Sequence, residues 1–185
     1  MRHFLLPIFL IICAPAFSAE SFGPKSLYRL EQQWTSQNGK TQFLSDLKGK
    51  PTIAAMIFTS CPATCPVIVS DMKSLDSRLT KTQRNNVQYA LFSIDPARDT
   101  PAALLSFSKK MKLDARWTLL TSKPDHVREL SVVLGFNYKP LDDGDFTHST
   151  TVFLLSADGE VVAKKERVSD EKEFMEKVRS LTGRK

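Results

Sequence analysis

The chain is poor in glycine and histidine and has no hydrophobic run long enough to cross a membrane. Its seven glycines include no glycine-rich turn between a strand and a helix, which excludes a dinucleotide or phosphate cradle. The longest apolar segment, residues 4–17, contains Pro7 and Pro15 and is shorter than the roughly 20 residues of a membrane span. The formal net charge is +6, but the basic residues are dispersed along the chain. Scattered charge of this kind indicates a solvated surface rather than a nucleic-acid site.

The first eighteen residues have the pattern of a secretory signal peptide. A short cationic start precedes the apolar segment, and Ala16 and Ser18 supply small residues at the −3 and −1 positions of a cleavage site after Ser18. Retention of this segment as an uncleaved anchor is the alternative. Export predicts an oxidising, extracytoplasmic location, the periplasm if the source is bacterial. Cleavage would remove Cys13 and leave Cys61 and Cys65 as the only cysteines.

The rest of the sequence predicts a flexible lead-in over residues 19–33 and one domain over residues 34–185. Asn38-Gly39, between two short segments, predicts an N-terminal β-hairpin over residues 34–44. Apolar runs that suit buried strands then alternate with segments of helical spacing. We expect strands at 52–58, 87–94 and 117–121, helices opening at 66, 100 and 124, a minor strand at 136–138, and a final hairpin and helix over 150–164 and 170–181. This order predicts an α/β sandwich of the thioredoxin type, with a central mixed sheet flanked by helices.

Cys61 and Cys65 lie four residues apart, between a predicted buried strand and a predicted amphipathic helix. Pro66 is well placed as the first residue of that helix, which puts Cys65 at or beside the N-cap. Unpaired N–H groups and the helix dipole favour an anion there, so we expect a lowered pKa for the Cys65 thiol. Such a pair can bind a soft metal ion, cycle between dithiol and disulfide, or form a structural disulfide. The structural disulfide is the weakest of these hypotheses, because so small a ring contributes only about 2 kcal/mol.

A metal site needs a third ligand, and only His126 and His148 remain once His3 leaves with the signal peptide. His126 lies among charged residues of a predicted helix and is interpreted as a surface residue. His148 precedes an apolar strand that, in a thioredoxin-type sheet, opens beside the helix of the cysteines, so its imidazole can face both sulfurs. Two thiolates and one imidazole suit Cu(I), whereas structural zinc sites normally have four protein ligands. Met56 and Met72 are also soft but fit core positions, so copper, as Cu(I) or Cu(II), is the predicted cofactor.

Three segments of the chain resemble the Sco (SenC) family of copper chaperones. They are residues 58–66 with their C-x-x-x-C-P motif, residues 92–101, and His148-Ser149 ahead of an apolar strand and the Asp158-Gly159 turn. The resemblance implies a thioredoxin-like fold and copper held by Cys61, Cys65 and His148. It also implies that Asp95 and Asp99 neighbour the copper site, either close behind the ligands or as stabilisers of their own loop.

The resemblance further implies delivery of copper to the dinuclear copper site of a respiratory cytochrome c oxidase, or maintenance of that site's cysteines. The partners would then be a copper-accepting oxidase subunit and a thiol reductant. The alternative is a thiol–disulfide oxidoreductase that acts through Cys61 and Cys65, joined as a disulfide in the oxidised form. Against it, thioredoxin-type oxidoreductases typically have two residues between their cysteines, and this chain has three. We therefore expect a metallochaperone rather than an enzyme, although Thr147 stands where the family commonly has an aspartate.

Overall fold

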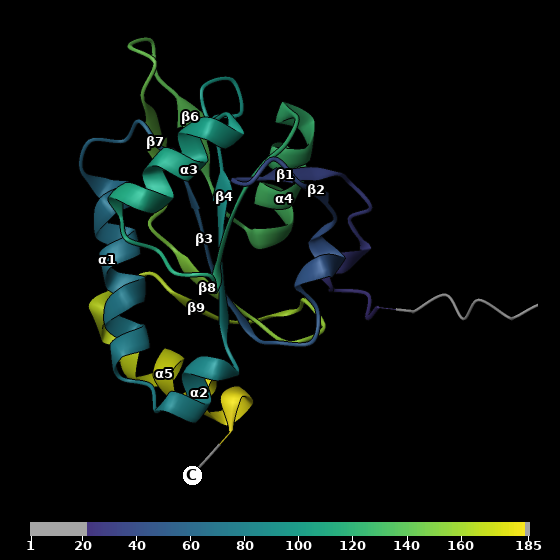
Figure 1. The fold of residues 1–185 in the computed structure, drawn as a ribbon, viewed down its shortest axis with the longest axis vertical. Helices are drawn as coiled ribbons and strands as arrows, with labels where there is room; N and C mark the ends of the chain where they lie inside the picture. The colour runs from purple at the N-terminus through teal and green to yellow at the C-terminus, as the bar shows by residue number, and fades with distance from the viewer. Residues whose placement is uncertain (1–21, 184–185) are drawn as a thin grey trace, which may run out of the picture.

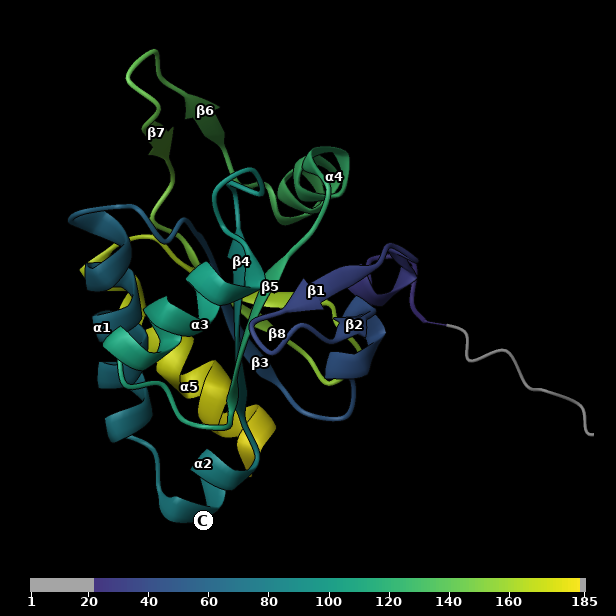
Figure 2. The ribbon, with the colours of Figure 1, turned by 45° about the horizontal axis from the view of Figure 1, so that its top comes forward.

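A seven-stranded β-sheet with helices on both faces forms the body of the structure, a computed structural model that describes residues 22–183 (Figures 1 and 2). The strand order is β2-β1-β5-β4-β3-β8-β9. β3, β4 and β5 are parallel, whereas β1, β8 and β9 are antiparallel to the strands they join. The predicted signal peptide and its cleavage site lie outside the described residues. The thioredoxin-type sandwich with a mixed sheet is confirmed.

The elements follow the apolar runs and helical segments of the sequence closely. The strands of the sheet are β1 (Trp34–Ser36), β2 (Thr41–Gln42), β3 (Thr52–Ile57), β4 (Gln88–Ser93), β5 (Trp117–Thr121), β8 (Val152–Leu155) and β9 (Val161–Lys165). The helices are α1 (Thr64–Ser77), α2 (Lys81–Asn85), α3 (Pro101–Lys110), α4 (Pro124–Leu134) and α5 (Glu171–Thr182), with 3-10 turns η1 (Leu27–Arg29), η2 (Leu44–Leu47) and η3 (Val168–Asp170). The short helix α2 is an addition to the predicted set.

β3 lies at the centre of the core, and its position explains its sequence. All six of its residues are buried. Figures 1 and 2 show α1, α3 and α5 on one side of the sheet and α4 on the other. A strand covered on both faces favours apolar side chains along its length, and the run from Ile53 to Ile57 meets that need. β3 ends at the residues that lead into the cysteines, so a fully buried strand inside the sheet supports their loop.

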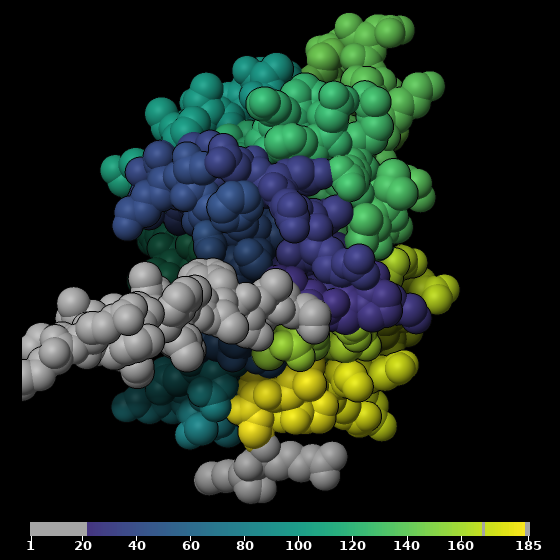
Figure 3. Space-filling model, turned by 90° about the vertical axis from the view of Figure 1, so that its right-hand side faces the viewer, coloured from purple at the N-terminus to yellow at the C-terminus, as the bar shows by residue number. Residues whose placement is uncertain are grey.

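The segment predicted as a flexible lead-in is folded against the domain over its described part, residues 22–33. Leu27 and Tyr28 are buried, and the Leu27 N–H donates to the Gly159 carbonyl at 3.0 Å. Ser26 forms an isolated β-bridge with Glu160. Figure 3 shows this purple segment seated on the body of the molecule. Leu27 and Tyr28 carry no periodic signal in the sequence, but they fill space beside the turn between β8 and β9.

Gly159 makes that close contact possible, and its replacement tests the packing. At Gly159 the backbone φ is +81°, and an added Cβ would lie 2.8 Å from the Tyr28 ring. Gly39, in the predicted hairpin turn between β1 and β2, has a similar φ of +74° with nothing within 4 Å of an added Cβ. We expect Gly39→Ala to lower the free energy of unfolding by about 1 kcal/mol through backbone strain. Gly159→Ala should lower it by this amount and by about 1–3 kcal/mol more, because the added Cβ overpacks the Tyr28 ring. Urea unfolding of both variants measures the difference, and equal losses would contradict the packing of Tyr28.

Two further strands form a separate hairpin that carries His148. β6 (Tyr138–Pro140) pairs with β7 (Phe146–His148) in antiparallel register, and the two make a sheet of their own. The minor strand predicted at 136–138 thus begins two residues later, and its partner β7 is an addition. Figures 1 and 2 show the hairpin projecting from the end of the body at which α1 begins. Between residues 22 and 183, no helix combines the length and the hydrophobicity that a membrane span requires.

Candidate metal centre

Cys61, Cys65 and His148 meet where the loop after β3, the first turn of α1 and the strand β7 converge. One ligand atom from each residue, Sγ or an imidazole nitrogen, lies within 4.8 Å of the others. His148 Nε2 is 4.0 Å from the Cys65 sulfur. Both cysteines are buried and free, and His148 is half-buried. The structure therefore brings together the three residues that the sequence singles out as ligands.

The helix α1 starts slightly earlier than Pro66 predicts. Ala63 is the N-cap and Thr64 the first helical residue, so Cys65 and Pro66 are the second and third residues of the helix. Proline is tolerated there because the first N–H groups of a helix have no partner within it. Ala63 offers no capping side chain. The Cys65 N–H donates instead to Cys61 Sγ at 3.3 Å, so the Cys61 sulfur takes the place of a cap.

The pKa of the Cys65 thiol is shifted in the direction opposite to the prediction. Cys65 has no exposed surface, and burial raises the pKa of its thiol far above the ordinary value. Its sulfur accepts the Phe58 backbone N–H at 3.4 Å, which lowers the pKa but does not offset the burial. The expected lowering is wrong because it considered only the helix N-terminus, whereas loss of hydration outweighs such a field at a fully buried sulfur. In the metal-free protein Cys65 is therefore a neutral thiol near pH 7.

This difference between the two cysteines predicts selective alkylation. Cys61 is 8% exposed and Cys65 is 0% exposed. In reduced protein at pH 8 we expect iodoacetamide to modify Cys61 at least about tenfold faster than Cys65, since only the thiolate reacts. The rate at Cys65, isolated in the Cys61→Ser variant, should keep rising as pH passes 9, because its raised pKa delays ionisation. Mass spectrometry of the labelled peptides measures both rates. Equal rates in the folded protein would contradict the burial of Cys65.

His148 is held in one orientation by a hydrogen bond and by ring contacts. Its Nδ1 lies 2.7 Å from the Ser149 carbonyl oxygen. A carbonyl only accepts, so Nδ1 carries a proton and, in the neutral imidazole, Nε2 has the lone pair that faces Cys65. The ring packs at 5.7 Å from Phe58 and 6.1 Å from Phe136, between centroids. An imidazole oriented in this way through its other nitrogen is the arrangement typical of metal-binding histidines.

The aromatic residues around His148 are the part of the site that the sequence analysis missed. Phe146 and His148 are two residues apart in β7, so they project to the same face of the strand. Phe146 packs on Phe58 with centroids 5.2 Å apart. Phe58 in turn donates its N–H to Cys65. The spacing Phe146-x-His148 is a signal that could have identified this contact.

The acidic loop between β4 and α3 supports the cysteine loop from behind. Asp99 is fully buried and accepts both the Thr59 N–H, at 3.1 Å, and the Thr59 hydroxyl, at 2.5 Å. It also accepts the Ser93 hydroxyl at 2.6 Å. Burial raises the pKa of the Asp99 carboxyl, against these hydrogen bonds. Asp95 is buried as well and pairs with Arg98. Asp99 thus fixes Thr59, the residue two positions before Cys61, whereas Asp95 is paired within its own loop.

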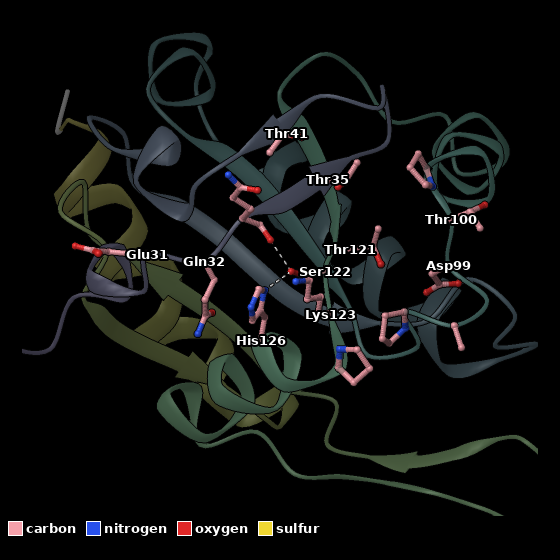
Figure 4. A pocket seen from close by; sticks show the side chains of 15 residues that line it. Glu31, Gln32, Thr35, Thr41, Asp99, Thr100, Thr121, Ser122, Lys123 and His126 are labelled. Atoms are coloured by element: carbon pink, nitrogen blue, oxygen red, sulfur yellow. Dashed lines mark hydrogen bonds between the residues drawn. The ribbon is translucent and has the colours of Figure 1, made fainter.

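His126 lies elsewhere, in a hollow of about 770 Å³ beside β1, β5 and the start of α4 (Figure 4). It is half-buried, and its Nδ1 is 2.8 Å from the Ser122 hydroxyl. That hydroxyl donates its only proton to the Gln33 carbonyl at 2.6 Å, so His126 must be the donor in their contact. Ser122 is therefore not activated by His126, and the pair is not the nucleophile and base of a hydrolase.

The chain is similar to known proteins in both sequence and fold. Residues 24–183 match the family model described as SCO1/SenC. A Bacillus subtilis (strain 168) protein described as an SCO1 protein homolog is 29% identical over 160 residues, which cover 84% of this chain and 81% of that protein. The structure of Bradyrhizobium japonicum ScoI with copper bound has a TM-score of 0.68 at 26% identity, covering 81% of this chain and 96% of that one. BsSco, described as a member of the Sco family of cytochrome c oxidase assembly proteins, has a TM-score of 0.69 at 26% identity, covering 81% and 90%.

Proposed function

This chain belongs to the SCO1/SenC family, and from that premise we propose that it binds one copper ion through the sulfurs of Cys61 and Cys65 and Nε2 of His148. The observation that carries the proposal is the approach of these three atoms to within 4.8 Å of one another. The structure of Bradyrhizobium japonicum ScoI with copper bound supports it.

The donor set fits copper in kind and in number. Two thiolates and one imidazole are soft ligands, and Cu(I) accepts three of them, whereas structural zinc normally takes four protein ligands. Met56 and Met72 also carry soft sulfur atoms, but both are fully buried core residues. Because the Cys65 thiol is neutral when metal-free, binding releases its proton, and the affinity for copper should rise with pH.

We propose that the bound copper is cargo, passed to the dinuclear copper site of a respiratory cytochrome c oxidase. The description of BsSco as a member of a family of oxidase assembly proteins supports this acceptor. A thiol reductant would be a second partner, since copper transfer requires reduced cysteines on both sides. Cleavage after Ser18 and export to an extracytoplasmic compartment would place the protein where such a site is exposed.

The thiol–disulfide oxidoreductase is not favoured as a second function. Its reaction needs an accessible thiolate and a leaving thiol of low pKa. Cys65 is fully buried and has a raised pKa, so it serves poorly in either step.

Titration of the reduced protein tests the binding site. Cu(I) is added in competition with a chromophoric chelator, and Cu(II) is added separately with spectra recorded. We expect one copper per chain in both experiments, and loss of tight binding in the Cys61→Ser, Cys65→Ser double variant. Transfer is then measured by mixing the loaded protein with the reduced soluble copper domain of an oxidase subunit. Failure of the reduced protein to bind Cu(I) or Cu(II) more tightly than about micromolar would overturn the proposal, and binding without transfer would overturn the acceptor alone.

A further inference from the structure

The hairpin that carries His148 has little stability of its own. β6 and β7 contain three residues each and pair only with one another in the described sheets. A two-stranded hairpin is marginal in water unless other parts of the protein hold it. Cys61 and Cys65, by contrast, follow the central strand β3 and open α1. The geometry of the three-residue site therefore depends on what fixes the hairpin to the body.

One anchor lies at the base of the hairpin and a second lies at its tip. At the base, His148 packs between Phe58 and Phe136, and Phe146, at the turn end of β7, packs on Phe58. At the tip, the Arg98 guanidinium donates through Nη2 to the Gly144 carbonyl oxygen. The same guanidinium lies over the Phe146 ring, 5.8 Å from its centroid. Arg98 thus contacts both the turn of the hairpin and Phe146, which lies two residues before His148.

Arg98 is itself held by a loop with several internal hydrogen bonds. Its Nε donates to the carboxylate of Asp95, which is 5% exposed. The loop closes on itself, because the N–H groups of Arg98 and Asp99 both donate to the Asp95 carbonyl, at 3.1 and 2.9 Å. The Asp95 N–H donates to the Ser93 hydroxyl at 3.0 Å. A guanidinium is planar and donates in several fixed directions, so it can hold Asp95 and Gly144 at once, which an ammonium group does less well.

We propose that Arg98 is the positioning residue of the site: it ties the tip of the β6–β7 hairpin to the loop after β4 and so holds His148 against Cys61 and Cys65. Arg98 binds no copper. It acts on the imidazole through the hairpin, and its contact with Gly144 sets how often His148 leaves the two sulfurs. The part of the proposal that concerns copper rests on the proposed function; the part that concerns the hairpin does not.

The first test uses the metal-free protein. Amide hydrogen exchange of residues 138–148 is compared between wild type, Arg98→Gln and Arg98→Lys. The matched control is Arg78→Gln, since Arg78 pairs with Glu171 at the far end of α1. We expect exchange in the hairpin to become about tenfold faster in Arg98→Gln, the effect of losing a charge-assisted hydrogen bond. Arg98→Lys should be intermediate and Arg78→Gln unchanged. Unchanged exchange in Arg98→Gln, with exchange in the rest of the domain also unchanged, would overturn the proposal.

The second test uses the copper-loaded protein and a readout that general destabilisation does not move. We expect Arg98→Gln to release copper to a chelator about tenfold faster and to weaken the imidazole nitrogen signal in the Cu(II) electron paramagnetic resonance spectrum. In a His148→Ala background, Arg98→Gln should add nothing to the release rate. An equal acceleration in both backgrounds would overturn the positioning role. If wild type binds no copper, the proposed function fails, and hydrogen exchange still decides whether Arg98 holds the hairpin.

Discussion

His148→Ala will lower the affinity of the reduced protein for Cu(II) at least about a hundredfold, while leaving the fold intact. The expected loss is this large because changes to residues that merely orient a metal ligand already cost about 10- to 100-fold, and His148 is proposed as a ligand itself. Its Nε2, 4.0 Å from the Cys65 sulfur, would supply the only nitrogen donor of the three. Cu(I) binding should fall less, because the two thiolates remain and Cu(I) also tolerates two-coordination by sulfur.

His126→Ala is the matched control, since it removes an imidazole from the hollow beside β5 and not from the cysteines. It should leave copper binding unchanged. Competition titrations with both oxidation states, together with the nitrogen signal in the Cu(II) spectrum, measure the effect. A His148→Ala variant that retains wild-type affinity for Cu(II) would show that the three-ligand site is wrong.

The second large effect is expected at Asp99, where alanine should lower the free energy of unfolding by about 3 kcal/mol or more. Asp99 is fully buried and accepts hydrogen bonds from three donors, the Thr59 N–H, the Thr59 hydroxyl and the Ser93 hydroxyl. Alanine leaves these donors with no partner in the interior, and each unsatisfied group carries a desolvation cost. Because Thr59 lies two residues before Cys61, the variant should also bind copper less tightly. Denaturant unfolding measures the loss, and a loss below about 1 kcal/mol would contradict this account.

Asp99→Asn separates the hydrogen bonds from the charge. Asparagine keeps an acceptor for Thr59 and carries no buried charge, so it should retain most of the stability that alanine loses. The pH dependence has a definite sign. Since burial raises the pKa of Asp99, the folded state holds its proton more tightly than the unfolded chain. Wild type should therefore gain stability relative to Asp99→Asn as pH falls through the raised pKa toward the ordinary carboxyl value, about 3.9. A relative loss of wild-type stability over that range would contradict the raised pKa.

The parts of the fold that the sequence predicts correctly are those decided by short-range chemistry. Asn38-Gly39 permits the tight turn between β1 and β2, and Gly39 has the positive φ that such a turn needs. Thr100, where the sequence predicts a helix to open, caps α3 by accepting the Ala103 N–H, and Pro101 is the first helical residue. The continuous apolar run of β3 is likewise a local signal of burial on both faces.

The errors arise where distant segments decide the outcome. The pKa of Cys65 depends on the burial of its sulfur, which Phe58 and His148 contact, whereas the helix N-terminus alone predicts a change of the opposite sign. The strand β7 has three residues, one of them the half-buried His148, and so offers little periodicity to detect. The sequence predicts that His148 faces the cysteines, but as the residue before β8. It reaches them from β7, and the aromatic contacts with Phe58 and Phe136 are long-range in the sequence.

The separation of the β6–β7 hairpin from the central sheet gives this architecture modularity. In the described sheets its ladder is shared with no strand of the body, and its turn over Asp142-Asp143-Gly144 is exposed. Insertions or substitutions in this turn would leave the register of the seven-stranded sheet untouched. Relatives can therefore diverge in the surface that surrounds the histidine while the scaffold of the cysteines is preserved. The turn can therefore be exchanged as a unit without disturbing the main sheet, provided that its replacement keeps the carbonyl that accepts from Arg98.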